Sequence, residues 1–282
     1  MGRLVEALEK VGYRDGETLF GAPYDFRQAP AAPGKPCRAF SRFRRQLRAL
    51  VEHASWTNGD QPVVLVSHSQ GGYFALEFLN RSPMAWRRRH VKHFVMASTG
   101  AGGFVLGLQS LVSVVSDASP MGLAGRSLAC KFTSLPCSTA TRRWWSRGTR
   151  TTGAPDGSRS PGVRGDAIQD DFRAPAVPTT CINGVGVPTT EKLVYWDGDF
   201  SQAPEIVYGD GDGVVNSASI LALDTVIGED PRQGYYKSVK IAGTSHDGVV
   251  SDGATLERLV SEIPRENFVQ ASKEEDSRVA QL

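Results

Sequence analysis

Hydrophobic residues recur with two different periods in the first hundred positions. In residues 38–53 apolar side chains lie three or four positions apart, which predicts an amphipathic helix with arginines on its solvent face. Residues 62–66 form a continuous β-branched and aliphatic run, typical of a strand buried on both faces of a parallel sheet. A second helix is expected at about 70–80 and a second buried strand at 91–97. This strand, turn, helix, strand order predicts an α/β fold.

The last third of the chain returns to the same pattern. Residues 179–184 and 238–242 predict two more strands, and residues 256–263 predict a closing helix. At the start, residues 1–19 predict a short helix followed by a strand-like stretch, with glycines as breakers. One α/β core is therefore expected to be built from both ends of the chain.

The middle of the chain shows neither period, which predicts an insertion. We expect residues 1–100 and 179–265 to be the N-terminal and C-terminal parts of the core, with 101–178 as a cap or insertion between them. Residues 128–175 are rich in Gly, Ser, Thr, Pro and Arg, and they bury too little apolar surface to offset their ordering entropy, so disorder is predicted. Residues 266–282 are charged and are expected to be a flexible tail.

Composition narrows the function classes. The chain has 282 residues, of which 40% are hydrophobic, and a net charge of +2, so nothing favours a nucleic-acid partner. No apolar run reaches the ~18 residues of a membrane-spanning helix, and no signal-peptide core is evident, so the location is left unknown. The four cysteines form no CxxC pair, which favours buried free thiols over a bridge between Cys130 and Cys137 or a metal site.

The strongest chemical signal is a serine at the turn between the strand at 62–66 and the helix at 70–80. Ser69 occupies the apex of Ser-x-Ser-x-Gly, where Ser67 replaces the usual first glycine of a nucleophile elbow. Small residues are expected at both flanking positions, 67 and 71, because the turn brings strand and helix close together. The backbone N–H of Gln70 would then point at a developing oxyanion.

A serine nucleophile needs an oriented base, and in elbow enzymes the chain order is serine, acid, histidine. Asp210 and Asp212 lie in a glycine-rich turn after a strand-like pair of residues, and His246 follows the predicted strand at 238–242. The alternatives are a calcium-binding or solvated turn for the aspartates and a surface position for the histidine. An EF-hand's bidentate glutamate is missing, which weighs against calcium.

These residues resemble the lecithin:cholesterol acyltransferase family, and the plant lecithin–cholesterol acyltransferase-like proteins in particular. The resemblance covers about 1–118 and 176–265. The matching motifs are residues 21–27, 67–72, 178–184, 191–196, 208–216 and 245–246. It implies an α/β-hydrolase-type, mostly parallel sheet with a nucleophile elbow and a cap, and it implies no cofactor, metal or nucleotide.

The resemblance also implies roles. Ser69 matches the family's nucleophile, Asp212, in preference to Asp210, matches the acid, and His246 matches the base. The implied reaction moves a fatty acyl group from a phospholipid to a hydroxyl acceptor, or to water in a phospholipase A or esterase reaction. Phospholipids and hydroxyl-bearing lipids are the implied partners, with peripheral contact to a membrane or lipid aggregate.

The chain departs from the family in two places. Family members carry a longer segment before the Tyr24–Asp25 loop, so we expect a truncated sheet without its first strands and without a second oxyanion donor. Residues 128–175 do not resemble the family's cap, and we interpret them as an aberrant, poorly ordered cap, hypothetically an out-of-frame or intronic translation. Two other functions stay open: a catalytically weak lipid-binding remnant and a carboxylesterase for short esters.

Overall fold

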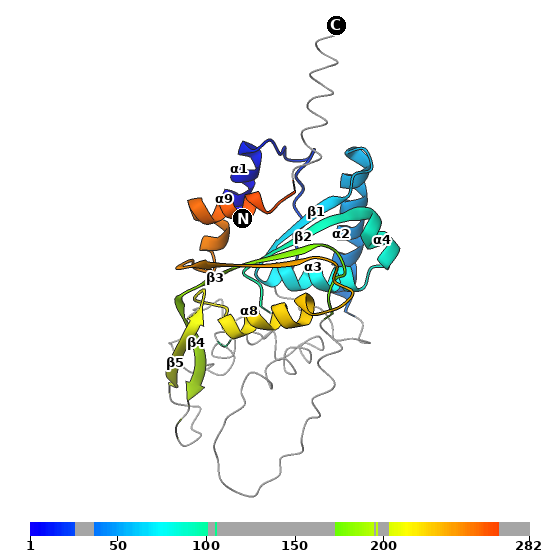
Figure 1. Ribbon diagram of the computed structural model, residues 1–282. Helices are drawn as coiled ribbons and strands as arrows, with labels where there is room; N and C mark the ends of the chain where they lie inside the picture. Colours follow the sequence, from blue (N-terminus) through cyan, green and yellow to red (C-terminus); the bar gives the residue numbers. More distant parts are fainter. Residues whose placement is uncertain (26–36, 101–104, 106–172, 195, 197–202, 265–282) are drawn as a thin grey trace, which may run out of the picture.

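The computed structural model describes residues 1–25, 37–100, 105, 173–194, 196 and 203–264 (Figure 1). Several predictions fall on other residues. They are most of the cap predicted at 101–178 (101–104 and 106–172), the tail from 266 to 282, the pairing of Cys130 and Cys137, and the last two positions of the 21–27 motif. Of the cysteines that the structure does describe, Cys37 and Cys181 are buried free thiols, as expected.

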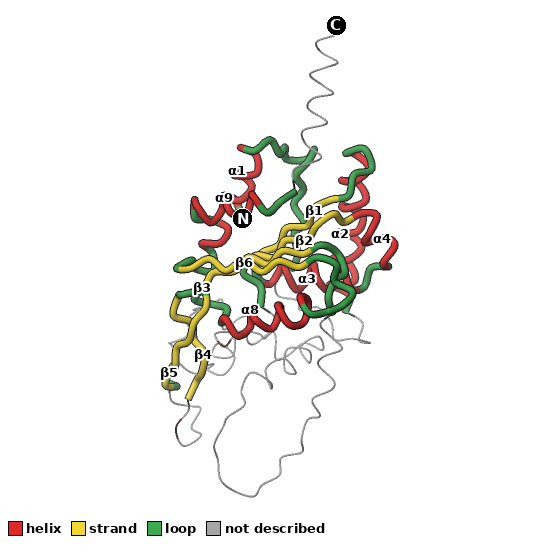
Figure 2. Tube along the Cα trace, viewed as in Figure 1, coloured by secondary structure: helices red, strands yellow, loops and turns green. Residues whose placement is uncertain are grey.

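Four parallel strands form the main sheet in the order β1-β2-β3-β6 (Figure 2). The strands are β1 (Val63–His68), β2 (Val91–Ala97), β3 (Thr179–Val185) and β6 (Tyr236–Ala242). The strands predicted at 62–66, 91–97, 179–184 and 238–242 are thus confirmed. Parallel pairing brings the carboxyl ends of all four strands to one edge of the sheet.

The strand β1 is less buried than its sequence suggested. Its first four residues are only half-buried, whereas Phe94 to Ala97 of β2 are fully buried. Among the described residues β1 lies at an edge of the sheet, so it lacks a neighbour on one side. The prediction that both faces of this strand are covered is confirmed, since Val63 and Leu65 pack against one core and Val64 and Val66 against the other. The incomplete burial follows from the edge position, which a β-branched run does not report.

Helices cover both faces of the sheet (Figure 1). One face carries α2 (Arg38–Thr57), α3 (Gln70–Asn80), α4 (Met84–His90) and α8 (Ser217–Leu223), which the π-helical turn η4 (Asp224–Gly228) extends. The other carries α1 (Gly2–Lys10), α9 (Gly253–Ser261) and the 3-10 turn η5 (Gly248–Val250). The helix predicted at 70–80 is confirmed with those bounds, and the helices predicted near the start, at 38–53 and at 256–263 are confirmed with shifted ends.

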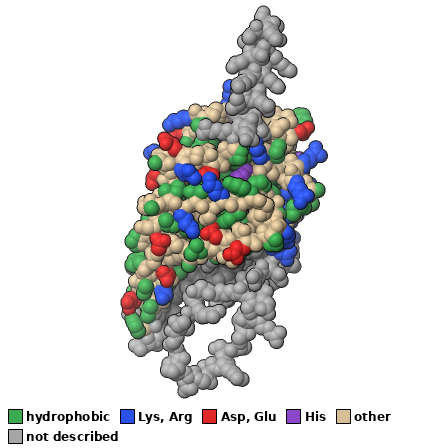
Figure 3. Space-filling view, viewed as in Figure 1, with side chains coloured by type: hydrophobic (Ala, Val, Ile, Leu, Met, Phe, Trp, Pro, Cys, Tyr) green, Lys and Arg blue, Asp and Glu red, His purple; other side chains and the backbone are tan. Residues whose placement is uncertain are grey.

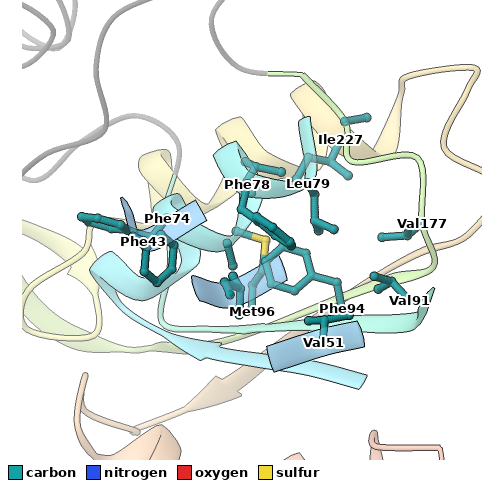
Figure 4. Packing of buried hydrophobic residues seen from close by; sticks show 14 of the residues in the cluster. Phe43, Val51, Phe74, Phe78, Leu79, Val91, Phe94, Met96, Val177 and Ile227 are labelled. Atoms are coloured by element: carbon teal, nitrogen blue, oxygen red, sulfur yellow. The ribbon is translucent and has the colours of Figure 1, made fainter. Parts of the chain in front are cut away.

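The larger core lies between the sheet and α3. Phe78 and Leu79 of α3 pack with Phe94 and Met96 of β2, and all four are at most 1% exposed (Figure 4). Neighbouring strand residues point the other way, so Val95 belongs to the second core beneath α1 and α9. Each fully buried side chain of this size contributes about 1.5–3 kcal/mol, so this two-sided core holds the serine-bearing turn on a rigid frame.

A two-stranded antiparallel arm stands apart from the main sheet (Figure 1). It consists of β4 (Val187–Val194) and β5 (Glu205–Gly211). The strand expected before the acidic turn is β5, but β4 was not predicted. At the start of the chain, the strand-like stretch forms only an isolated bridge between Asp15 and Leu19.

Residues 173–178, at the end of the predicted insertion, pack on the core. Ala174 and Val177 are buried in the larger core. Asn80 at the end of α3 donates its side-chain amide to the carbonyl of Arg173 at 2.8 Å. The return from the insertion to β3 is therefore tied to α3, whose first turn follows Ser69.

Candidate active site

Ser69 connects β1 directly to α3 in a strained backbone conformation. Its φ of 53° and ψ of −128° place a non-glycine residue in a region that L-residues avoid. Neighbouring groups hold it there. Its N–H donates to the carbonyl of Ala97 at 2.9 Å, and its carbonyl accepts from Thr99 Oγ1 and from the N–H of Gly72, both at 3.0 Å. A strained backbone conformation that several neighbouring groups hold in place is typical of functional sites.

The tight approach within this turn is at Gly72. A Cβ there would lie 2.7 Å from Thr99 Cγ2 and nearer still to its hydroxyl. At Gly71 a Cβ would meet Tyr24 Cε1 at 3.4 Å, an ordinary contact. The expectation that position 71 must be small is therefore wrong in detail: the close packing falls one residue later, where α3 crosses the end of β2.

The carboxylate of Asp212 is fully buried, between its own turn and His246. Its Oδ1 accepts from the N–H groups of Val214 at 2.9 Å and Val215 at 2.7 Å. Thr189 on β4 fixes the same turn, because its Oγ1 accepts from the N–H of Gly213 at 2.8 Å. One carboxylate oxygen is thus used to hold the turn, and Oδ2 is left to face His246.

Asp210 points elsewhere. Its carboxylate accepts from the N–H of Gly186 at 2.6 Å and from the hydroxyl of Ser217. The hydrogen bond from Ser217 is the main cause that lowers the pKa of Asp210. It joins the arm to the start of α8 and has no contact with the histidine among its described hydrogen bonds.

His246 lies between Ser69 and Asp212. Its Nε2 is 2.8 Å from Ser69 Oγ and its Nδ1 is 2.9 Å from Asp212 Oδ2. A carboxylate only accepts, so Nδ1 carries the hydrogen and Nε2 is free to accept from the serine hydroxyl. The side chain is 12% exposed, so a substrate could reach it from one side. Both ring nitrogens are engaged, which leaves neither to a metal in this arrangement.

The backbone of His246 is also held. Its N–H donates to the carbonyl of Asp212 at 2.8 Å. Its carbonyl accepts from His68 Nε2 and from Ser98 Oγ, both at 3.0 Å. Sequence reasoning missed these two contacts, because a serine or histidine at a strand end gives no signal of a partner far along the chain.

Gln70 is the first residue of α3, at the helix end whose N–H groups favour negative charge. The role of its N–H as an oxyanion donor stays a prediction, and so do the catalytic roles of Ser69, Asp212 and His246. The structure brings these last three together from the β1–α3 turn, the turn after β5 and the loop after β6.

On the face in view, basic and acidic side chains are interspersed (Figure 3).

Within the described part of the chain, no helix is both long and apolar enough to cross a membrane.

Comparison with known proteins finds relatives whose names describe acyltransferases. Lecithin-cholesterol acyltransferase-like 1 of Arabidopsis thaliana is 36% identical over 295 residues, covering 96% of this chain and 66% of that protein. Lysosomal phospholipase A and acyltransferase of Mus musculus is 30% identical, covering 91% of this chain and 64% of that protein. The chain thus spans slightly less than two thirds of the length of either relative.

A lipase-esterase related protein from Clostridium acetobutylicum overlaps in structure with a TM-score of 0.40 and 10% identity, covering 93% of this chain and 88% of that chain. This likeness is too remote to add to what the sheet and the serine turn show by themselves. That arrangement, a parallel sheet with a strained serine between β1 and α3, is of the α/β-hydrolase type.

The sequence pattern of the family described as Lecithin:cholesterol acyltransferase matches residues 2–136. This match passes residue 118, where the first of the two stretches of motif resemblance ended. The Arabidopsis protein extends the similarity over most of the chain. The chain belongs to the lecithin:cholesterol acyltransferase family.

Proposed function

We propose that this chain is a lipid O-acyltransferase that moves a fatty acyl group from a phospholipid to a hydroxyl acceptor through an acyl-enzyme on Ser69. The observation that carries the proposal is the relay in which His246 lies 2.8 Å from Ser69 Oγ and 2.9 Å from Asp212 Oδ2. A serine hydroxyl is a weak nucleophile, and a base within hydrogen-bonding distance is what activates it.

The first half-reaction forms the acyl-enzyme. Nε2 of His246 takes the proton of the Ser69 hydroxyl while Oγ attacks the ester carbonyl of the phospholipid. The backbone N–H of Gln70 stabilises the oxyanion of the tetrahedral intermediate. The intermediate collapses, His246 returns the proton to the departing lysophospholipid oxygen, and the acyl group stays on Ser69. Asp212 remains ionised and stabilises the imidazolium.

The second half-reaction decides between transfer and hydrolysis. His246 takes the proton of an acceptor hydroxyl while the acceptor oxygen attacks the acyl-enzyme. The tetrahedral intermediate collapses, His246 gives the proton to Ser69 Oγ, and a new ester and the free serine are released. Water in place of the alcohol gives a fatty acid, which is phospholipase A chemistry. The mouse relative is named for both activities, which supports treating the two outcomes as branches of one intermediate.

The substrates proposed are a phospholipid donor and a hydroxyl-bearing lipid acceptor. The name of the Arabidopsis relative refers to lecithin and to cholesterol, which supports a lipid at both steps. Lipids of this kind occur in membranes and aggregates, so we propose that the chain works in peripheral contact with such a surface.

The test uses phosphatidylcholine vesicles with a long-chain alcohol or sterol, and resolves the products by headgroup and acyl position. Wild type is expected to give lysophospholipid together with acyl ester, and Ser69→Ala is expected to give neither. Fluorophosphonate labelling at Ser69 provides a lipid-free measure of the activated nucleophile. His53→Leu, at an exposed site on α2, is the matched control and should behave as wild type.

Each alternative has its own result. Fatty acid without any acyl ester would make the chain a phospholipase. Turnover of short soluble esters, with none of vesicles, would make it a carboxylesterase. A folded wild-type protein that neither labels nor turns over substrate would overturn the enzymatic proposal in favour of a lipid-binding remnant.

A further inference from the structure

We propose that His68 and Ser98 are positioning residues that hold the backbone carbonyl of His246 and so set its imidazole between Ser69 and Asp212. This inference rests on the proposed function, because it assigns two further residues to the same relay. Neither side chain reaches the reacting atoms. Both act through His246.

The need for such an anchor follows from where His246 lies. It is in a loop after β6, between Ala242 and the short turn η5, so the regular hydrogen bonds of a helix or strand do not hold its backbone. Its ring must nevertheless keep two hydrogen bonds, at 2.8 Å and 2.9 Å, in one orientation. A misplacement of about 1 Å in such a site can cost about 100-fold in rate.

The two anchors come from the strands next to the nucleophile. His68 is the last residue of β1 and directly precedes Ser69, and Ser98 directly follows β2. The imidazole Nε2 and the hydroxyl Oγ both reach the same oxygen at 3.0 Å. The distance between nucleophile and base is thereby tied to the parallel pairing of β1 and β2.

Ser98 is built for this contact. It is fully buried, and its φ of 50° is strained for a residue with a side chain. Its N–H donates to the carbonyl of Ile182 on β3 at 2.8 Å, which fixes the strained turn to the neighbouring strand. A glycine would adopt this backbone more easily, but it would lack the hydroxyl that donates to the carbonyl of His246.

His68 has matching properties. Burial lowers its pKa, so the ring is neutral at neutral pH, and a carbonyl partner requires the hydrogen on Nε2. Its ring centroid lies 4.9 Å from that of His246. A neutral neighbour at this distance buttresses the base without opposing the positive charge that His246 acquires when it takes the serine proton.

Because both donors share one acceptor, either can partly replace the other, and this makes a sharp test. The variants are His68→Leu, Ser98→Ala, the double variant, and His68→Gln, whose amide nitrogen can donate from about the same place. We expect each single loss to slow fluorophosphonate labelling of Ser69 about 5-fold, the size of one ordinary hydrogen bond. The double variant should fall about 100-fold, more than the product of the singles.

Two readouts separate positioning from a merely structural effect. With ester substrate, kcat should fall while KM stays unchanged, and His68→Gln should recover most of the rate lost in His68→Leu. Amide hydrogen exchange at His246 should speed up in the double variant, since its loop is released, while the unfolding midpoint stays close to that of wild type. His53→Leu should change none of these.

The outcomes are distinct. If Ser69 is labelled equally fast in wild type and in the double variant, the positioning role is overturned and the proposed function stands. Failure of His68→Gln to recover the rate would also count against it. Wild type that does not label would remove the proposed function, and the positioning role with it.

Discussion

The side chain of Thr99 fills the space that any side chain at Gly72 would need. Its hydroxyl donates to the carbonyl of Ser69, and its methyl carbon lies 2.7 Å from where a Cβ on Gly72 would be. The segment just after β2 therefore holds the strained serine and sets the distance between α3 and the sheet. Geometry at the nucleophile depends on one small residue that does not react.

Gly72→Ala should therefore destabilise the protein by about 1–3 kcal/mol, the usual cost of overpacking a filled site, and should slow labelling of Ser69. Gly71→Ala is the matched control, because its Cβ has room, and its stability should be equal or slightly higher. Urea unfolding of the two variants measures the difference. Equal losses at both positions would show that Thr99 can move aside.

The two aspartates of the acidic turn should differ in effect. Asp212→Asn should lower the rate of Ser69 labelling by about 10⁴-fold, since an amide disturbs the tautomer and charge that the imidazole needs. Asp210→Asn should keep most of the rate, because that carboxylate contacts Gly186 and Ser217 instead. Labelling kinetics at equal protein concentration compare them. A greater loss in Asp210→Asn would reverse the assignment.

Thr189 is expected to matter through the turn that carries Asp212. Thr189→Val removes the acceptor for the partly buried N–H of Gly213, which should cost about 1 kcal/mol of stability and slow labelling by roughly 10-fold. Thr190→Val changes the neighbouring residue on the opposite face of β4 and is the control. Thermal unfolding and labelling of both variants provide the measurement, and identical behaviour would sink this prediction.

Stability should fall on acidification. Burial lowers the pKa of His68 and of His93 below their ordinary value of 6.5, so below that pH the unfolded chain binds more protons than the folded one. This contribution is complete above pH 6.5 and is lost progressively as the pH falls toward the folded-state pKa values. The urea unfolding midpoint is expected to be lower at about pH 5.5 than at about pH 7.5. His93→Gln should reduce this change of stability with pH. A midpoint that rises on acidification would contradict it.

Much of the fold could be predicted because its strands and helices are locally encoded. The apolar spacing before residue 57 and the aliphatic runs of β2 and β3 leave little choice of element. The strand β4 was missed because its eight residues mix polar and apolar types, and because it is stabilised by pairing with β5 rather than by its own pattern. The degree of burial of β1 could not be read from its residues either, because it depends on the position of this strand at the edge of the sheet.

The sequence by itself determined the order of the elements, the serine at the apex of a strand-to-helix turn, and the candidates Asp212 and His246, because turn chemistry and hydrophobic period are properties of adjacent residues. Tertiary structure alone decided that Asp212 uses one carboxylate oxygen for its own turn and the other for His246, that the close approach falls at Gly72, and that His68 and Ser98 share one carbonyl oxygen. Such contacts join residues far apart in the chain. Their distances follow from how the strands pair and the loops pack, and no local pattern records them.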